Sequence, residues 1–281
     1  MSVARSWDDK EVAPELQRIY AEVRASFDLP FVPTFFKLLS SYPEYLRTMW
    51  GDLGPVVRSR EFQTAGRAME EFVRSLVASG GWKIFDQQRI LAGQRFSADD
   101  VEQLGSIAST FARFTARLTL FARLMQKGYS GGQPGRFSNG RQLSALARLV
   151  TLHVPDESTA GLRAWLIYSD IKRTLGVRHI FSLFRILSPF PGYLASLWLD
   201  SKRLFHDANF VQARDQAAKR AIGLIVGIPV KDHRAAARPI DVGQWREIEQ
   251  LVDNYARLMP QLALLSVTWQ RSLAVAGPIA A

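Results

Sequence analysis

One stretch of the sequence decides the fold, because it occurs twice. Residues 19–50 read IYAEVRASFDLPFVPTFFKLLSSYPEYLRTMW, and residues 167–198 read IYSDIKRTLGVRHIFSLFRILSPFPGYLASLW. At a constant spacing of 148 residues, nine of the 32 paired positions are identical, where random pairing at ordinary composition would give roughly two. The identical pairs are Ile19/Ile167, Tyr20/Tyr168, Phe36/Phe184, Leu39/Leu187, Ser40/Ser188, Pro43/Pro191, Tyr45/Tyr193, Leu46/Leu194 and Trp50/Trp198. The chain therefore contains an internal duplication.

The long spacing of the repeat predicts two halves of domain size rather than an array of short repeats. We assign residues 1–128 to a first helical module, residues 129–157 to a linker and residues 158–281 to a second helical module. The linker begins with YSGGQPGRFSNG, whose glycines, serines and proline favour neither helix nor strand. Two related halves commonly pack about a pseudo-twofold axis. We therefore expect a cleft between them, where small-molecule sites concentrate.

Apolar residues recur at helical spacing throughout the chain, and no segment alternates as a strand would. We predict an all-α fold. Each half should begin with a helix, a turn, a short helix and then a helix started by a proline, Pro43 or Pro191. We also predict a helix over residues 82–92.

Two further helix starts are predicted from capping residues. Ser97 with Asp100 indicates a capping box at the start of the longest helix of the first half. Asp241 and Gln244 are expected to cap the last helix.

The composition is that of a globular but basic chain. The net charge is +10 and the isoelectric point about 10.1, with basic residues scattered rather than gathered in runs. This charge favours an anionic partner, such as a small acid, nucleic acid or a membrane surface. The absence of cysteine excludes disulfides, thiolate zinc sites and thiol nucleophiles. Because no signal peptide or transmembrane pattern occurs, we expect a cytoplasmic protein without a transmembrane segment.

Motifs for common cofactors are missing from the sequence. No glycine-rich nucleotide motif and no nucleophile elbow is present, and the histidines follow no metal-ligand spacing. The four histidines are His153, His179, His206 and His233. We therefore expect neither a metal nor a cofactor.

The segments just before the two short helices are the first candidates for a site. Residues 30–34 and 178–182 each leave a loop and enter a helix, where hydroxyls and free backbone N–H groups favour a carboxylate. Residues 29–46, LPFVPTFFKLLSSYPEYL, resemble the first signature of the group I 2-haloacid dehalogenases, a family also described as halocarboxylic acid dehydrogenases. Residues 167–198 resemble the second signature.

The resemblance implies two all-helical pseudo-repeats around a buried cleft. In that family an aspartate activates a water molecule, which displaces halide directly from the α-carbon of a 2-haloacid. No covalent enzyme ester forms and no cofactor takes part.

Carried over residue by residue, the resemblance assigns substrate-binding roles to Phe31, which replaces a family tryptophan, and to Thr34, at a second aromatic position. Ser182 retains the family's serine, with a catalytic and a substrate-binding role. Leu183 stands where the family has its water-activating aspartate. Because leucine cannot accept a proton from water, the family's mechanism cannot proceed through this position.

His179 is the candidate for a substitute catalytic base, since imidazole titrates near neutral pH. An ordinary surface or core position for this histidine is the alternative. Arg178 beside it is a candidate to pair a substrate carboxylate through two hydrogen bonds.

Three functions remain open at this point. The first is hydrolysis of a small 2-substituted carboxylic acid by a divergent dehalogenase with an altered or lost base, and the enzyme interpretation leans this way. The second is a non-catalytic module that binds a small carboxylate in the cleft. The third, which the signatures disfavour, is a basic helical protein that binds nucleic acid or an anionic membrane with a steep salt dependence. A homodimer is compatible with each of them.

Overall fold

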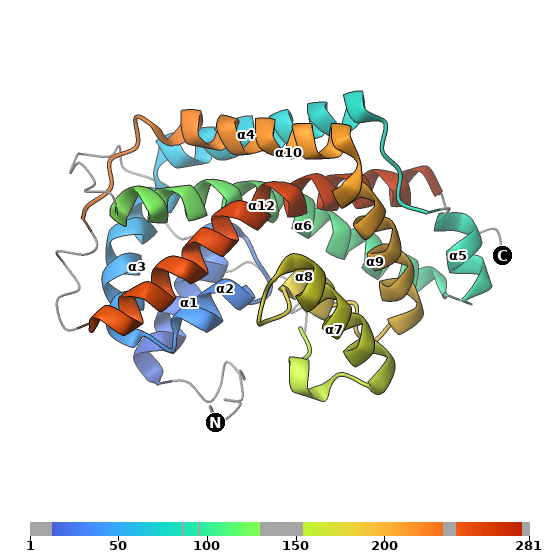
Figure 1. Ribbon diagram of the computed structural model, residues 1–281, viewed down its shortest axis with the longest axis horizontal. Coiled ribbons are helices and arrows are strands. Elements are labelled where there is room, and N and C mark those ends of the chain that lie inside the picture. Colours follow the sequence, from blue (N-terminus) through green and yellow to red (C-terminus); the bar gives the residue numbers. More distant parts are fainter. Residues whose placement is uncertain (1–12, 86, 95, 130–153, 233–239, 277–281) are drawn as a thin grey trace.

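The computed structural model describes residues 13–85, 87–94, 96–129, 154–232 and 240–276. Every regular element within these ranges is helical, so the all-α prediction is confirmed (Figure 1). The elements are α1 (Pro14–Phe27), α2 (Thr34–Leu39), α3 (Pro43–Arg58), α4 (Arg60–Gly80), α5 (Gln87–Gly93), α6 (Ala98–Tyr129), a 3₁₀ turn η1 (Glu157–Thr159), α7 (Leu162–Leu175), α8 (Ser182–Arg185), α9 (Pro191–His206), α10 (Ala208–Ile225) and α12 (Val242–Ala276). Within the described ranges, no helix is both long and apolar enough to cross a membrane.

Helices at the repeat spacing have matching bounds. Helix α1 covers residues 14–27 and α7 covers 162–175, while α3 covers 43–58 and α9 covers 191–206, so each bound is displaced by 148 residues. Both α3 and α9 begin with a proline, whose missing N–H costs nothing in the first turn.

The next pair of helices also starts in the same way in both halves. The Ser59 side chain accepts a hydrogen bond from the Phe62 N–H at the start of α4, at 3.2 Å. The Asp207 carboxylate accepts one from the Phe210 N–H at the start of α10, at 2.8 Å. The predicted caps of α6 and α12 are confirmed as well, by Ser97 with Asp100 and by a bond from the Gln244 N–H to the Asp241 carboxylate.

The two longest helices form the centre of the molecule. In Figure 1, α12 runs along α6, and α10 lies beside α4. One continuous hydrophobic cluster joins residues of both sequence halves, among them Phe36 and Phe121 from the first half and Phe184 and Trp269 from the second. The first half therefore buries its apolar surface largely against the second. Most of the expected linker, residues 130–153, lies outside the described residues.

The predicted helix over residues 82–92 is partly wrong, because helical structure begins only at Gln87. Gly81 ends α4 with a left-handed φ of 64°, which turns the chain away from the helix axis. The following loop is then held by distant side chains. The Ile84 N–H donates to the Ser272 hydroxyl at 3.0 Å, and the Phe85 N–H donates to the Asp200 carboxylate.

Candidate functional site

The starts of the two short helices bring Thr34 and Ser182 together. Thr34 is the first residue of α2 and Ser182 the first residue of α8, and both side chains are buried. The Thr34 N–H donates to the Ser182 Oγ at 3.0 Å, and the two hydroxyl oxygens lie 2.9 Å apart. The Thr34 hydroxyl donates to the Ile180 carbonyl at 3.3 Å, so the proton between the two hydroxyls belongs to Ser182. Two predicted residues, 148 positions apart, are thus in direct contact.

The hydroxyl pair borders a small cavity of about 20 Å³. This volume is enough for about one water molecule. Its apolar walls include Phe35, Phe111, Phe114, Phe181, Leu183 and Met259. Its polar lining consists of the hydroxyl-bearing residues Thr34, Thr115, Ser182 and Tyr255, so no carboxylate and no imidazole is among the described residues that line it.

The four hydroxyls differ in what they can offer a ligand. The Thr115 hydroxyl is used within α6, where it donates to the Phe111 carbonyl at 2.7 Å. The protons of the Thr34 and Ser182 hydroxyls are used in their own network. Among the described residues, the Tyr255 hydroxyl has no hydrogen-bond partner. It is therefore the cavity's free donor.

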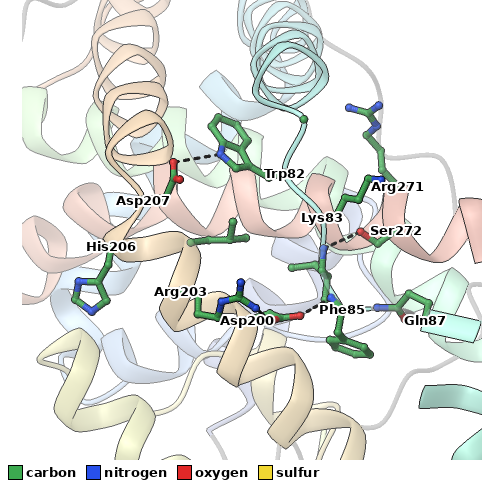
Figure 2. A pocket seen from close by; sticks show the side chains of 13 residues that line it. Trp82, Lys83, Phe85, Gln87, Asp200, Arg203, His206, Asp207, Arg271 and Ser272 are labelled. Carbon is green, nitrogen blue, oxygen red and sulfur yellow. Dashed lines mark hydrogen bonds and ion pairs between the residues drawn. The ribbon is translucent and has the colours of Figure 1, made fainter. Parts of the chain in front are cut away.

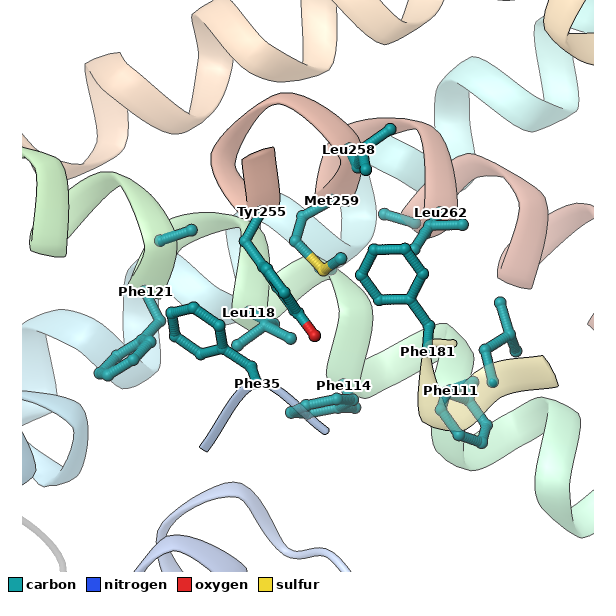
Figure 3. Packing of buried hydrophobic residues seen from close by; sticks show 14 of the residues in the cluster. Phe35, Phe111, Phe114, Leu118, Phe121, Phe181, Tyr255, Leu258, Met259 and Leu262 are labelled. Carbon is teal, nitrogen blue, oxygen red and sulfur yellow. The ribbon is translucent and has the colours of Figure 1, made fainter. Parts of the chain in front are cut away.

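Tyr255 projects from α12 between Phe35 and Phe181, and its hydroxyl is directed away from the α12 backbone (Figure 3). The ring centroids of Phe35 and Phe181 lie 4.3 Å and 5.0 Å from that of Tyr255. Burial raises the pKa of the Tyr255 hydroxyl above its usual range, and the nearby charge of Arg185 opposes this rise. At neutral pH the hydroxyl is therefore protonated and can donate a hydrogen bond.

Arg185 supplies a buried positive charge at the end of α8. Its guanidinium donates two hydrogen bonds to the Pro155 carbonyl, at 2.9 Å from Nε and 2.7 Å from Nη2. Burial lowers the pKa of Arg185, and the charges of Asp156 and Glu157 partly oppose this effect. A buried cation close to Tyr255 favours an anionic ligand over a neutral one.

Phe31 and Leu183 both belong to the surroundings of the cavity. Phe31 is buried and stacks on Phe111, with ring centroids 5.3 Å apart, and meets Phe114 edge-on at 6.4 Å. It therefore supports the wall from behind rather than lining it. Leu183, at the position that the resemblance assigns to the aspartate, lines the cavity directly.

His179 and Arg178 do not lie with the other predicted residues. Both are exposed, and neither lines the cavity. Although His179 is exposed at the surface, the surrounding protein removes part of the water around its imidazole, and this desolvation lowers its pKa. The charge of Glu157 opposes this shift, and Lys172 and Arg178 add to it. At neutral pH the imidazole is thus mostly neutral, in the form of a base. Its catalytic role stays a prediction.

Tyr255 is the site residue that sequence reasoning missed. Its neighbours along one face of α12, Val252, Met259 and Leu262, are apolar, so the pattern indicates core. The available signal was a tyrosine within an apolar helical stripe, because its hydroxyl needs a partner once the stripe is buried. Within the described ranges, no group of three or more histidine, aspartate or glutamate side chains is placed to hold a metal ion.

Comparisons with known proteins agree on one family. The family described as halocarboxylic acid dehydrogenase DehI matches residues 30–184. An (R)-2-haloacid dehalogenase of Rhizobium sp. (strain NHG3) is 22% identical over 236 residues, which cover 82% of this chain and 90% of that protein. An (R)-2-haloacid dehalogenase of Pseudomonas putida is 20% identical over 280 residues, which cover 94% of this chain and 90% of that protein.

Solved structures show the same fold. A D-2-haloacid dehalogenase mutant in complex with D-2-CPA has a TM-score of 0.82 at 20% identity and is covered over 94% of both chains. A D-2-haloacid dehalogenase in complex with L-LA has the same TM-score and coverage at 19% identity.

Proposed function

Because this chain belongs to the halocarboxylic acid dehydrogenase DehI family, we propose that it binds a small 2-substituted carboxylic acid beside Thr34 and Ser182 and hydrolyses it weakly or not at all. The observation that carries this proposal is the lining of the cavity, in which four hydroxyl-bearing residues and Leu183 are present without a carboxylate or imidazole among the described residues. Binding needs donors and apolar walls. Hydrolysis by an activated water needs a base as well.

We place this site at a cleft between two modules, residues 1–128 and 158–281, related by a pseudo-twofold axis. The matching helix bounds and the direct contact of Thr34 with its repeat equivalent Ser182 support this arrangement. Residues 129–157 would connect the modules.

In the proposed complex, the ligand's carboxylate accepts a hydrogen bond from the Tyr255 hydroxyl, and the charge of Arg185 reduces the cost of burying the anion. The α-substituent packs against phenylalanines such as Phe111 and Phe114. Since the cavity has room for about one water molecule, the surrounding aromatic side chains must move to admit the acid.

His179 and Arg178 enter the proposal as residues of the loop that precedes α8. For His179 to act as a base, its exposed side chain would have to turn toward the cavity, where Arg178 could then meet the carboxylate. A homodimer and a cytoplasmic location likewise stay predictions.

Binding can be tested by isothermal titration calorimetry with D- and L-2-chloropropionate. Tyr255→Phe removes the free donor, so we expect an affinity about tenfold lower, equivalent to about 1.4 kcal/mol. The same substitution should leave the free energy of unfolding unchanged or higher, because the hydroxyl it removes has no hydrogen-bond partner among the described residues. Tyr20→Phe, at a buried tyrosine of α1 outside the lining, is the matched control. Equal affinity of the native protein and Tyr255→Phe, or no binding of either enantiomer, would refute the proposal.

A further inference from the structure

A second and much larger pocket, of about 1030 Å³, lies where the loop after α4 meets the ends of α9 and α12 (Figure 2). It shares no lining residue with the cavity beside Thr34 and Ser182. Trp82, Ile84, Phe85 and Leu204 give it apolar walls. Its size and walls suit an organic molecule larger than a halopropionate.

Gln87, at the wall of this pocket, carries a buried donor without a partner. The side chain is 3% exposed, and its Nε2 is among the buried nitrogen atoms of the described residues that have no hydrogen-bond partner. Unpaired buried donors are rare in folded proteins, and an acceptor supplied by a ligand would satisfy this one. In Figure 2 the amide nitrogen is directed toward Phe85, on the inner side of the loop.

The orientation of the Gln87 amide follows from its other contacts. The Trp269 indole N–H donates to the Tyr193 hydroxyl oxygen at 2.7 Å, and that hydroxyl lies 2.7 Å from the Gln87 Oε1. Because an indole nitrogen can only donate, Tyr193 accepts from Trp269 and gives its own proton to Gln87. The amide oxygen is thus used by Tyr193, and the amide NH₂ group faces the other way.

The charges of the described residues that line the pocket favour an anion. The two aspartates are already used, since Asp200 accepts from Arg203 at 3.3 Å and from the Phe85 N–H, and Asp207 caps α10. Lys83 and Arg271 line the pocket, are exposed, and have no acidic partner among the described residues. In Figure 2 the Arg271 guanidinium points away from Asp200, and Lys83 lies on the loop that leads into Gln87.

We propose that this pocket binds an organic acid with an aromatic body. The carboxylate accepts hydrogen bonds from the Gln87 amide and the Lys83 ammonium, and the aromatic body packs against Trp82 and Phe85. This inference is independent of the function proposed for the cavity beside Thr34 and Ser182.

Phenylacetate serves as the probe, with 2-phenylethanol as its neutral analogue, in calorimetry on the full chain. Gln87→Glu retains an acceptor for Tyr193 but places a carboxylate oxygen where the N–H was, so we expect phenylacetate binding to weaken by at least about tenfold. Lys83→Ala should weaken it severalfold, and the alcohol should bind less tightly than the acid. Lys83 is exposed, so this variant decides the question if Gln87→Glu fails to fold.

Lys231→Ala is the matched control, because Lys231 stands 148 residues after Lys83 and lies in the segment that follows α10, beside Asp52. It should leave phenylacetate binding unchanged.

Trp82→Phe should abolish most of the ligand-induced change in tryptophan fluorescence, which places the ligand in this pocket. No saturable binding at millimolar phenylacetate, or equal binding by the native protein and Lys83→Ala, would overturn the proposal. Loss of binding in Tyr255→Phe instead would place phenylacetate in the other cavity and overturn it too.

Discussion

The Ser182 hydroxyl makes two hydrogen bonds to Thr34, which lies 148 positions earlier in the chain. It accepts one from the Thr34 N–H and donates one to the Thr34 hydroxyl. The repeat alone predicted that these residues share a site, because equivalent segments of a duplicated chain tend to meet across its axis. The contact itself depends on two helix starts facing each other, which no local pattern encodes. The Ser182 hydroxyl thus already makes structural hydrogen bonds when no ligand is bound.

Tyr255, in contrast to Thr34 and Ser182, could not be predicted from the sequence as a residue of the candidate site. It lies 73 positions after Ser182 and in an apolar stripe, so the sequence around it predicts core and nothing else. Its special property is a hydroxyl that borders the cavity and has no partner among the described residues, and this depends on α2, α6 and α8 reaching α12 from elsewhere in the chain.

Asp170 gives a residue-scale prediction about acid stability. Hydrogen bonds from Lys202 at 2.8 Å and from the Trp198 indole at 2.7 Å lower its pKa to about 2. The unfolded value is about 3.9, so the ionised carboxylate stabilises the fold above about pH 4, and this contribution is lost as the pH falls toward 2. After allowance for solvent screening, we expect a loss on the order of 1 kcal/mol.

Asp170→Asn should remove this pH dependence while retaining an acceptor for Trp198. The free energy of urea unfolding, measured for both proteins from pH 5 to pH 2, checks the difference. Parallel losses of stability in the native protein and the variant over this range would contradict the assignment.

At the scale of elements, the helix ends follow the repeat closely. Helices α1 and α7 both end at a residue with left-handed backbone, Asp28 with φ 54° and Gly176 with φ 66°. The helix starts could be predicted from capping residues and prolines, because these residues act on their own helix. The loop before Gln87 could not be predicted, because its backbone N–H groups donate to Asp200 and Ser272, which are more than a hundred residues away.

Two glycine substitutions should therefore have opposite effects on stability. A Cβ added at Gly176 or at Gly105 meets no atom within 4 Å, so neither variant creates a clash. Gly176→Ala forces a left-handed alanine and should cost about 1 kcal/mol. Gly105→Ala, inside α6, should add about 0.5–1 kcal/mol. The midpoints of denaturant unfolding measure both stability changes. Shifts of the same sign would contradict the explanation that the backbone conformation of each glycine determines its effect.

At the scale of the whole molecule, α6 from the first half and α12 from the second form a shared centre. The hydrophobic pattern predicted that these helices have buried faces. It could not predict that they face each other, because an apolar stripe does not specify its partner.

The shared core predicts that the two halves unfold together. Far-ultraviolet circular dichroism and tryptophan fluorescence should give one coincident transition in denaturant, since neither half keeps its core when the other unfolds. Two separated transitions would show that the halves are independently stable modules.

Halide release tests the central claim most directly. Leu183 lines the cavity where a base would be needed, and loss of a general base lowers a rate by roughly 10²- to 10⁴-fold. With D- or L-2-chloropropionate, the native protein should release halide weakly or undetectably, and Leu183→Asp should raise the rate. Rapid halide release by the native protein, undiminished by His179→Ala, would contradict both the missing base and its proposed substitute.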